Sequence, residues 1–475
     1  MVMGDMEMNT DLLIVGSGPG GYGAAFRAAD LGLDVIMVDP TPRPGGICLH
    51  KGCIPSKTFL HIAELIHDVS RAKSMGVGFG EAQIDLPAMQ TWRRQVVDSM
   101  AEGLMTLVKR RGILLMEGMA RFDSSSSVRL EGAEISRVRF KKAIIATGSR
   151  PLELPGAPFS PGGRIMDSAA ALTLPDIPKK LLVVGGGYVG LELGSVYAAL
   201  GSSVTLVEVE NRLLAQVDAD LVRPLQKRLS GLFADIRFGV RVENMQEDSD
   251  GVTVSFRQEQ KSEQQRFNRV LVAIGRVPNS EGLGLEHTDV QLDDRGFILV
   301  DERQQTSDAH LFAVGDVAGG VMLAHKATRE GRVAAEVIGG QNSSFDARAI
   351  PAVVYTDPQI SWCGLTEHQA KAENIPYQKQ KFPWKYSGRA QTIGMTEGFT
   401  KLLTDPESGR ILGVGITGRN AEGLIGEATL AIEMGALAED LALTIHPHPT
   451  LSEQMGEAAH LGLGTPIHVA LGKRR

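Results

Sequence analysis

Two of the three cysteines in this chain, Cys48 and Cys53, lie five positions apart. They belong to the segment GGICLHKGCIPSK, residues 45–57, which we expect to place both thiols at the start of a helix. The helix dipole favours thiolate there, so the pair could cycle between dithiol and disulfide. An ordinary buried pair is the simpler alternative. A zinc site with Cys48, His50 and Cys53 as ligands would need a fourth ligand, which the segment does not supply.

A histidine and a glutamate near the end of the chain could serve those thiols. The segment HPHPTLSE, residues 446–453, places Glu453 five positions after His448. An imidazole can take a proton from a thiol, and a carboxylate on its other nitrogen fixes the tautomer and stabilises the cation. Taken alone, His448 is more simply a structural histidine in a proline-rich turn. With a thiol pair in the same chain, we expect an acid/base dyad.

The composition limits the cellular location and the classes of partner that we expect. Three cysteines among 475 residues is the usage of a reducing compartment and predicts a cytoplasmic location, with Cys363 as an inert core thiol. The net charge of -7 without a long basic stripe argues against a nucleic-acid partner. No apolar run reaches the length of about 18 residues that a membrane span needs, and we expect neither a membrane partner nor a signal peptide.

A repeated pattern indicates how these residues are positioned. An apolar strand, a glycine-rich turn, a helix and a second strand ending in an acid occur twice. The first copy has its glycines at Gly16, Gly18 and Gly21 and its acid at Asp39; the second has Gly185, Gly187, Gly190 and Glu208. In both copies the acid follows the first glycine by 23 residues.

This combination is the dinucleotide-binding fingerprint rather than two unrelated glycine-rich turns. The glycines allow a tight turn and a close approach of backbone N–H groups to a pyrophosphate, while the acid accepts a hydrogen bond from a ribose hydroxyl. We therefore expect two dinucleotides. An acid repels a 2′-phosphate, so Glu208 favours NAD over NADP, although Arg212 lies close in the sequence.

A chain of this length predicts several domains. Each repeat ends in a strand that runs into glycine, at Gly148 and at Gly275, and a third such run at residues 311–316 is expected to return to the first unit. We predict an α/β fold with two Rossmann-like dinucleotide-binding domains, one at 1–150, which also carries the thiol pair, and one at 151–278. Residues 279–349 would complete the first domain, and 350–475 would form a C-terminal α+β domain containing a strand at 352–355, a hairpin of 399–403 with 411–416 and a helix at 421–434.

The chain resembles the dihydrolipoamide dehydrogenases within the pyridine nucleotide-disulfide oxidoreductase family along essentially its whole length. The resemblance rests on the redox motif at 45–57, on the terminal His448, Pro449, Thr450 and Glu453, and on both fingerprints. It implies FAD at the first fingerprint, NAD at the second and a C-terminal dimerisation domain. The residues expected to contact FAD are Gly16, Gly18, Gly21, Asp39, Lys57, Ala146, Thr147, Gly148, Asp316, Met322, Leu323, Ala324 and His325, and those expected to contact NAD are Gly185, Gly187, Gly190, Glu192, Glu208 and Gly275.

The resemblance also implies an activity and partners. The enzyme would oxidise protein-bound dihydrolipoyl groups and reduce NAD, with Cys48, Cys53, His448 and Glu453 as catalytic residues and no metal. It would form a homodimer in which His448 and Glu453 of one subunit complete the site at the other subunit's Cys48, and it would serve a lipoylated carrier domain of a multienzyme complex.

Some residues depart from the family pattern. Ile47 and His50 replace the usual Thr and Asn beside the first cysteine, which could bring a second imidazole near that thiol, and the order Ala421-Glu422-Gly423 puts the usual contact of Glu422 in doubt. Two alternatives stay open: a glutathione-type disulfide reductase, against which Glu208 argues, and a noncatalytic flavoprotein docking subunit, against which the intact thiols and dyad argue.

Overall fold

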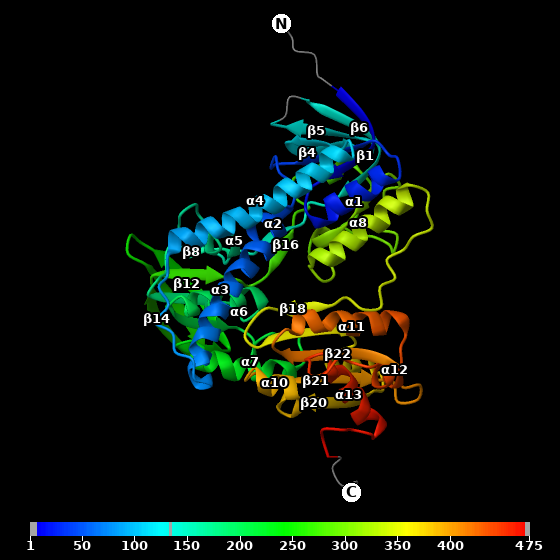
Figure 1. Cartoon of the computed structure of the whole chain (residues 1–475). Helices are drawn as coiled ribbons and strands as arrows, with labels where there is room; N and C mark the ends of the chain where they lie inside the picture. Colours follow the sequence, from blue (N-terminus) through cyan, green and yellow to red (C-terminus); the bar gives the residue numbers. More distant parts are fainter. Residues whose placement is uncertain (1–6, 133–134, 471–475) are drawn as a thin grey trace.

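The computed structural model describes residues 7–132 and 135–470. Figure 1 shows the N-terminal sheet at one end of the molecule, the second α/β unit at its side and the C-terminal sheet at the other end. No helix among the described residues is long and apolar enough to cross a membrane.

The first sheet has seven strands in the order β3-β2-β1-β6-β5-β4, with β17 also paired to β6. Strands β1, β2, β3, β6 and β17 are parallel, whereas β4 and β5 form an antiparallel extension. The strands are β1 (Glu7–Val15), β2 (Val35–Asp39), β3 (Leu114–Glu117), β4 (Met119–Ser124), β5 (Ser127–Glu131), β6 (Arg137–Ile145) and β17 (Leu311–Ala313). Its helices and 3-10 turns are α1 (Pro19–Asp30), α2 (Gly46–Lys51), α3 (Cys53–Ala72), η1 (Lys73–Met75), α4 (Leu86–Arg110), η2 (Leu285–His287), η3 (Gly315–Ala318) and α8 (Ala324–Ile338).

The return of the chain to this sheet follows the prediction. Strand β17 pairs in parallel with the second half of β6, with Leu311 opposite Ala143. Helices α1 and α8 pack tightly because small residues face each other: a Cβ on Gly23 would lie 3.2 Å from the Thr328 methyl group. The chain after the second unit thus completes the first sheet, while the domain limits at 150, 278 and 349 stay predictions.

The second unit repeats the parallel pattern in a sheet of order β11-β10-β9-β15-β8. Its strands are β8 (Ile165–Met166), β9 (Lys180–Val184), β10 (Ser203–Glu208), β11 (Asp235–Phe238) and β15 (Arg269–Val272), and its helices are α5 (Ser168–Ala171), α6 (Tyr188–Ala199) and α7 (Ala219–Leu232). An antiparallel sheet of β12 (Val240–Glu247), β13 (Val252–Gln258) and β14 (Lys261–Phe267) adjoins it. Two short antiparallel strands, β7 (Ser149–Pro151) and β16 (Arg276–Pro278), connect the two units.

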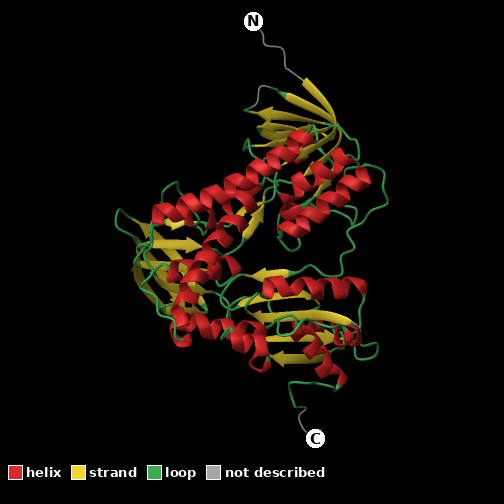
Figure 2. Cartoon of the chain, in the orientation of Figure 1, coloured by secondary structure: helices red, strands yellow, loops and turns green. Residues whose placement is uncertain are grey.

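The C-terminal unit is an antiparallel sheet of order β18-β19-β22-β21-β20 with helices around it (Figure 2). Its elements are β18 (Ala352–Val354), β19 (Gln359–Gly364), α9 (Glu367–Glu373), β20 (Gln378–Pro383), η4 (Trp384–Tyr386), α10 (Gly388–Thr392), β21 (Phe399–Thr404), β22 (Ile411–Gly418), α11 (Ala421–Met434), α12 (Ala438–Leu443) and α13 (Glu453–Leu463). The hairpin and the helix predicted here are confirmed as β21–β22 and α11.

A shared core joins the C-terminal sheet to the other units. Phe59 of α3, Leu206 of β10, Leu221 of α7 and Phe399 of β21 belong to one buried apolar cluster. A Cβ on Gly415 of β22 would lie only 2.7 Å from Leu221, so the glycine lets α7 approach the sheet closely. Helix α7 therefore links the second unit to the C-terminal sheet.

Candidate active site

The two clustered thiols lie on consecutive helices. Cys48 is in the short helix α2, and Cys53 is the first residue of the 20-residue helix α3. The expected position at a helix start is thus found for Cys53, whereas Cys48 lies one helix earlier. Gly46 precedes them with φ of +58°, and a Cβ there would lie 2.6 Å from the Gly18 Cα, so this glycine lets the thiol segment touch the first fingerprint.

The two cysteines, both free thiols here, differ in acidity. A hydrogen bond from Cys48 lowers the pKa of Cys53 to about 7; burial opposes this shift, and the charge of Lys57 adds to it. The same hydrogen bond, with burial, raises the pKa of Cys48 well above its usual value. In the dithiol state Cys53 is therefore the more acidic of the two thiols, and Cys48 keeps its proton.

A charged pair from two units lies beside Cys53. Lys57, one turn along α3, places its Nζ 2.8 Å from Oε2 of Glu192 on α6. Glu192 is buried, and its Oε1 accepts a hydrogen bond of 2.9 Å from the backbone N–H of Tyr355, whose ring centroid lies 4.3 Å from the Lys57 Nζ. This arrangement holds the positive charge of Lys57 near Cys53, whose thiolate it stabilises.

A cavity of about 830 Å³ opens in front of the thiols. It extends from Asp39 to Cys53, and its lining includes most of the residues expected at the first dinucleotide: Gly16, Gly18, Asp39, Lys57, Ala146, Thr147, Gly148, Asp316, Met322 and Ala324. Three expected residues are not in the lining. Gly21 supports the turn, since its Cβ would lie 1.9 Å from the Gly16 carbonyl oxygen; Leu323 precedes α8; and His325 lies 2.7 Å from the Pro351 carbonyl oxygen.

The backbone of this cavity fits a dinucleotide. Gly16 has φ of +104°, and a Cβ there would lie 2.3 Å from the Ala146 carbonyl oxygen, so only glycine allows the strand and the turn to meet. Among the described residues, no side chain forms a capping hydrogen bond at Gly18, the N-terminus of α1, where N–H groups can bind a pyrophosphate. Asp39 is fixed by hydrogen bonds from the Ser17 N–H at 2.7 Å and the Thr41 N–H at 2.9 Å.

A second cavity of about 720 Å³ follows the second fingerprint. Gly185, Gly187, Glu208 and Gly275 line it, whereas Glu192 lines the first cavity, and Gly190 supports the turn with its Cβ position 2.2 Å from the Gly185 carbonyl oxygen. Glu208 accepts hydrogen bonds from the Gly186 and Glu210 N–H groups at 2.5 and 2.8 Å. Arg212 donates instead to the carbonyl oxygens of Ala215 and Val217, so its guanidinium is held by its own loop.

His448 and Glu453 are in contact, as predicted. His448 Nδ1 lies 2.7 Å from Glu453 Oε1, and Glu453 Oε2 accepts a 2.7 Å hydrogen bond from the Thr450 N–H. The His448 side chain is 71% exposed, and neither residue lines the cavity in front of its own chain's thiols. Figure 1 places α13, which begins at Glu453, in the C-terminal unit at the lower end of the view, whereas α2 lies higher, beside α3 and α4.

Comparison with known proteins decides the family. The model of the pyridine nucleotide-disulphide oxidoreductases matches residues 10–331, and the model of their dimerisation domain matches residues 350–459. The chain belongs to the pyridine nucleotide-disulphide oxidoreductase family. The fold predicted from the sequence, two dinucleotide-binding units and a C-terminal dimerisation domain, is thereby confirmed, and membership implies FAD and a nicotinamide dinucleotide.

Relatives in this family match over nearly the full length. The chain is 44% identical to a dihydrolipoyl dehydrogenase of Vibrio parahaemolyticus over 461 residues, 97% of each chain, and 43% identical to one of Geobacillus stearothermophilus over 470 residues, 99% of each. Among solved structures, LpdA of Mycobacterium tuberculosis matches with a TM-score of 0.88 at 27% identity, covering 95% of this chain and 99% of that one.

Some residues of this family member were not anticipated from the sequence. Tyr188 and Arg276 line both cavities, and Tyr355 joins the C-terminal unit to Glu192. The first two directly follow fingerprint or strand-end glycines, which is a usable sequence signal. Nothing local marks Tyr355, because its partners are distant along the chain.

The departures from the family pattern have defined positions. His50 Nε2 lies 3.1 Å from the Pro44 carbonyl oxygen, so this imidazole is anchored to the loop before α2. One buried carboxylate oxygen of Glu422 has no hydrogen-bond partner among the residues that the structure describes, and burial raises the pKa of Glu422.

Proposed function

We propose that this family member is a dihydrolipoyl dehydrogenase, which oxidises dihydrolipoyl groups to lipoyl groups and reduces NAD. The observation that carries the proposal is the polarised thiol pair at the wall of the first cavity, in a chain 44% identical over 97% of its length to a protein of that activity. The polarised, accessible pair argues against a purely structural docking role.

FAD would occupy the first cavity, with its adenosine ribose at Asp39, its pyrophosphate at Gly16 and Gly18, and its reactive end toward Cys53, Lys57 and Asp316. Gly21, Ala146, Thr147, Gly148, Met322, Leu323, Ala324 and His325 would complete or support this site. The chemistry that FAD supplies when bound is two-electron transfer between the thiol side and the nicotinamide side.

The thiols carry the substrate half of the reaction. Starting from the Cys48–Cys53 disulfide, a substrate thiolate attacks the Cys48 sulfur, the Cys48–Cys53 bond breaks, and Cys53 leaves as a thiolate. The second substrate thiolate then attacks the substrate sulfur bound to Cys48, which releases a cyclic disulfide and reduced Cys48. His448 takes the substrate proton, and Glu453 holds its imidazole in orientation and stabilises the cation. The electron pair then lies on the cysteines, with the Cys53 thiolate stabilised by Lys57.

NAD would occupy the second cavity, with Gly185, Gly187 and Gly190 at its pyrophosphate and Gly275 toward its nicotinamide end. That end would extend past Tyr188 and Arg276, which line both cavities, to Glu192 in the first cavity. Glu208 would accept hydrogen bonds from its ribose. A 2′-phosphate would lie against the Glu208 carboxylate, and Arg212 is held by Ala215 and Val217, so we expect NAD rather than NADP.

A homodimer would complete the active site. His448 is exposed, neither residue of the dyad lines the cavity in front of its own chain's thiols, and residues 350–459 match a dimerisation domain. A twofold interface would bring His448 and Glu453 of each subunit to Cys48 of the other and give two equivalent sites. The dimer would act on a lipoylated carrier domain of a multienzyme complex. We expect it to be located in the cytoplasm.

The test is a steady-state comparison of purified enzyme with dihydrolipoamide and reduced glutathione as donors, each with NAD and NADP. We expect dihydrolipoamide with NAD to give the highest kcat/KM, and a Cys48→Ser variant to keep bound FAD but lose this activity. Preference for glutathione with NADP would contradict the proposal and favour the glutathione-type alternative.

A further inference from the structure

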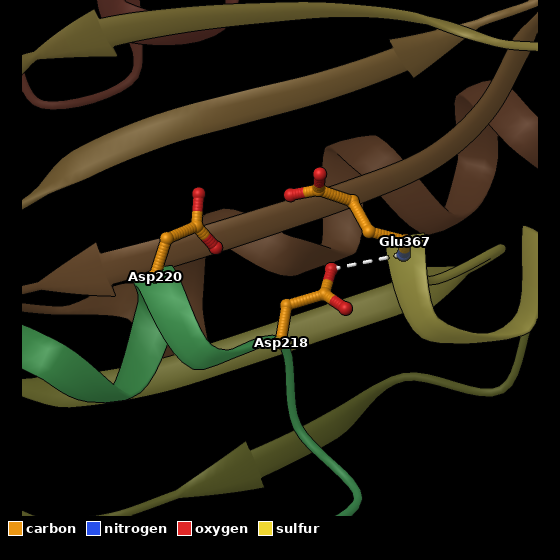
Figure 3. Close-up of side chains that lie close together, drawn as sticks. All are labelled: Asp218, Asp220 and Glu367. Carbon is orange, nitrogen blue, oxygen red and sulfur yellow. Dashed lines mark hydrogen bonds between the residues drawn. The ribbon is translucent and has the colours of Figure 1, made fainter. Parts of the chain in front are cut away.

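A buried lysine joins the second unit to the C-terminal sheet. Lys401 on β21 is 1% exposed, and its Nζ lies 2.8 Å from a carboxylate oxygen of each of Asp218, Asp220 and Glu367. Figure 3 shows that the first two acids come from the start of α7 and the third from another segment, with their carboxylates turned toward one another. Among the described residues, these three acids form the group whose spacing would suit a metal ion. Here the Lys401 amine, rather than a metal ion, provides the positive charge that balances them.

Two of the three carboxylates that balance this charge come from the second unit. Lys401 lies directly opposite Lys381 in the β20–β21 register, and like charges in that position are destabilising. Burial lowers the pKa of Lys401, but hydrogen bonds to the three carboxylates outweigh this effect and raise it. Asp218 and Asp220 therefore compensate a charge that the C-terminal sheet buries.

Asp218 makes further contacts with the C-terminal unit. Its carboxylate accepts hydrogen bonds from the backbone N–H groups of Glu367 and His368 at 3.1 and 3.2 Å, so it caps the first turn of α9. With Lys401, three donors from the C-terminal unit hold this one carboxylate. The carboxylate of Asp218 is thus held by donors from outside its own unit.

Asp218 is also the end of a loop, residues 209–218, that starts after Glu208. Leu214 and Ala215 of this loop line the second cavity. Leu214 has φ of +47°, a left-handed conformation that a leucine keeps only where its surroundings impose it. Fixing Asp218 holds the loop at the end that follows Leu214.

Leu214 connects the loop to the second fingerprint. Its N–H donates to the Gly186 carbonyl oxygen at 3.0 Å, and the Gly186 N–H donates to Glu208. A Cβ on Gly186 would lie 2.9 Å from the Leu213 side chain, so turn and loop are in close contact. A shift of the loop would therefore move the turn that faces the dinucleotide.

We propose that Lys401 is a positioning residue for the nicotinamide dinucleotide: through Asp218 it fixes loop 209–218, and through Leu214 it fixes the Gly186 turn. A side chain of the dimerisation domain thereby sets the affinity of the second cavity. This inference rests on the proposed function only in assigning NAD to that cavity.

The test compares Lys401→Met with Lys379→Met in the FAD-bound dimer. Lys379 is 41% exposed, and its ion pair of 3.0 Å is with Glu367 rather than with Asp218, so it is a matched control. In Lys401→Met we expect the Kd for NADH, followed by fluorescence, to rise about tenfold, as for a typical coupling between sites. Amide hydrogen exchange in residues 209–218 should accelerate, while anaerobic reduction of the enzyme by dihydrolipoamide should stay within about twofold of the wild type. The control should resemble the wild type throughout.

Other outcomes overturn the inference. Unchanged exchange and NADH affinity in Lys401→Met would show that the loop does not depend on the lysine, and an equal loss of NADH binding and of dithiol reduction would indicate general destabilisation. If Lys401→Met does not fold, Asp218→Asn gives the test, because it keeps a carbonyl acceptor while removing the charge that meets Lys401; it too should lower NADH affinity selectively. A wild type that binds NADH but does not oxidise dihydrolipoamide would refute the proposed function and leave the exchange and affinity measurements valid.

Discussion

Replacing Lys57 by Met should make Cys53 a weaker acid. Lys57 lies four residues after Cys53 on α3, so both side chains share one face of the helix, and its charge helps to lower the Cys53 pKa to about 7. A positive neighbour stabilises the thiolate, and its removal must therefore raise the pKa. An opposite charge within about 4 to 6 Å shifts a pKa by about 1 to 3 units, and for Lys57 we expect a shift of the Cys53 pKa near the lower limit because Lys57 also pairs with Glu192.

A shift of about one unit has a measurable consequence. At pH 7 the thiolate fraction of Cys53 would fall from about one half to about one tenth, so alkylation should slow about fivefold. The reduced enzyme would be treated with iodoacetamide across a pH series. Trypsin cleaves after Lys51, so mass spectrometry reads Cys48 and Cys53 on separate peptides. Cys363 is an internal control, because burial raises its pKa to about 12.

Glu192→Gln should change the Cys53 pKa in the opposite direction to Lys57→Met. The Glu192 charge raises the pKa of Cys53, so its removal should lower that pKa and speed alkylation at pH 7. If both variants shift the pKa of Cys53 in the same direction, or if Lys57→Met leaves the pH profile of alkylation unchanged, electrostatic control by this ion pair is refuted. Local packing would then explain the acidity of Cys53.

Three further outcomes are expected. Glu208→Arg should narrow or invert the preference for NAD by about tenfold or more in kcat/KM, and a wild type more efficient with NADP than with NAD would refute the role of Glu208. Gly21→Ala should yield protein with little bound FAD, seen as lost visible absorbance at equal protein concentration, because its Cβ would lie 1.9 Å from the Gly16 carbonyl oxygen; full retention of FAD would contradict this reading of the turn. Mixed Cys48→Ser and His448→Ala subunits should regain up to about half of the wild-type activity per heterodimer, since one site carries both lesions and the other neither. Proven heterodimers as inactive as their parents would place the whole site within one subunit.

Several features were determined by the sequence itself because their physics is local. The two fingerprints follow from glycines at fixed spacing between buried strands: Gly16 and Gly185 have φ of +104° and +108°, conformations that side-chain-bearing residues rarely adopt. The His448–Glu453 pair is also local, since five residues and a turn bring the imidazole and the carboxylate to 2.7 Å. The hairpin and α11 of the C-terminal unit were predictable from short apolar patterns in the same way.

Other features were decided only by the tertiary structure. Lys401 belongs to the strand FTKLLT, whose sequence does not show that the lysine is buried, yet it packs against acids more than 180 residues earlier in the chain, Asp218 and Asp220. Tyr355 reaches Glu192 across 163 residues, and no local pattern marks either contact. Such contacts depend on how whole units pack, here on the packing of α7 against the C-terminal sheet. A charge can be buried only where the fold places an opposite charge beside it.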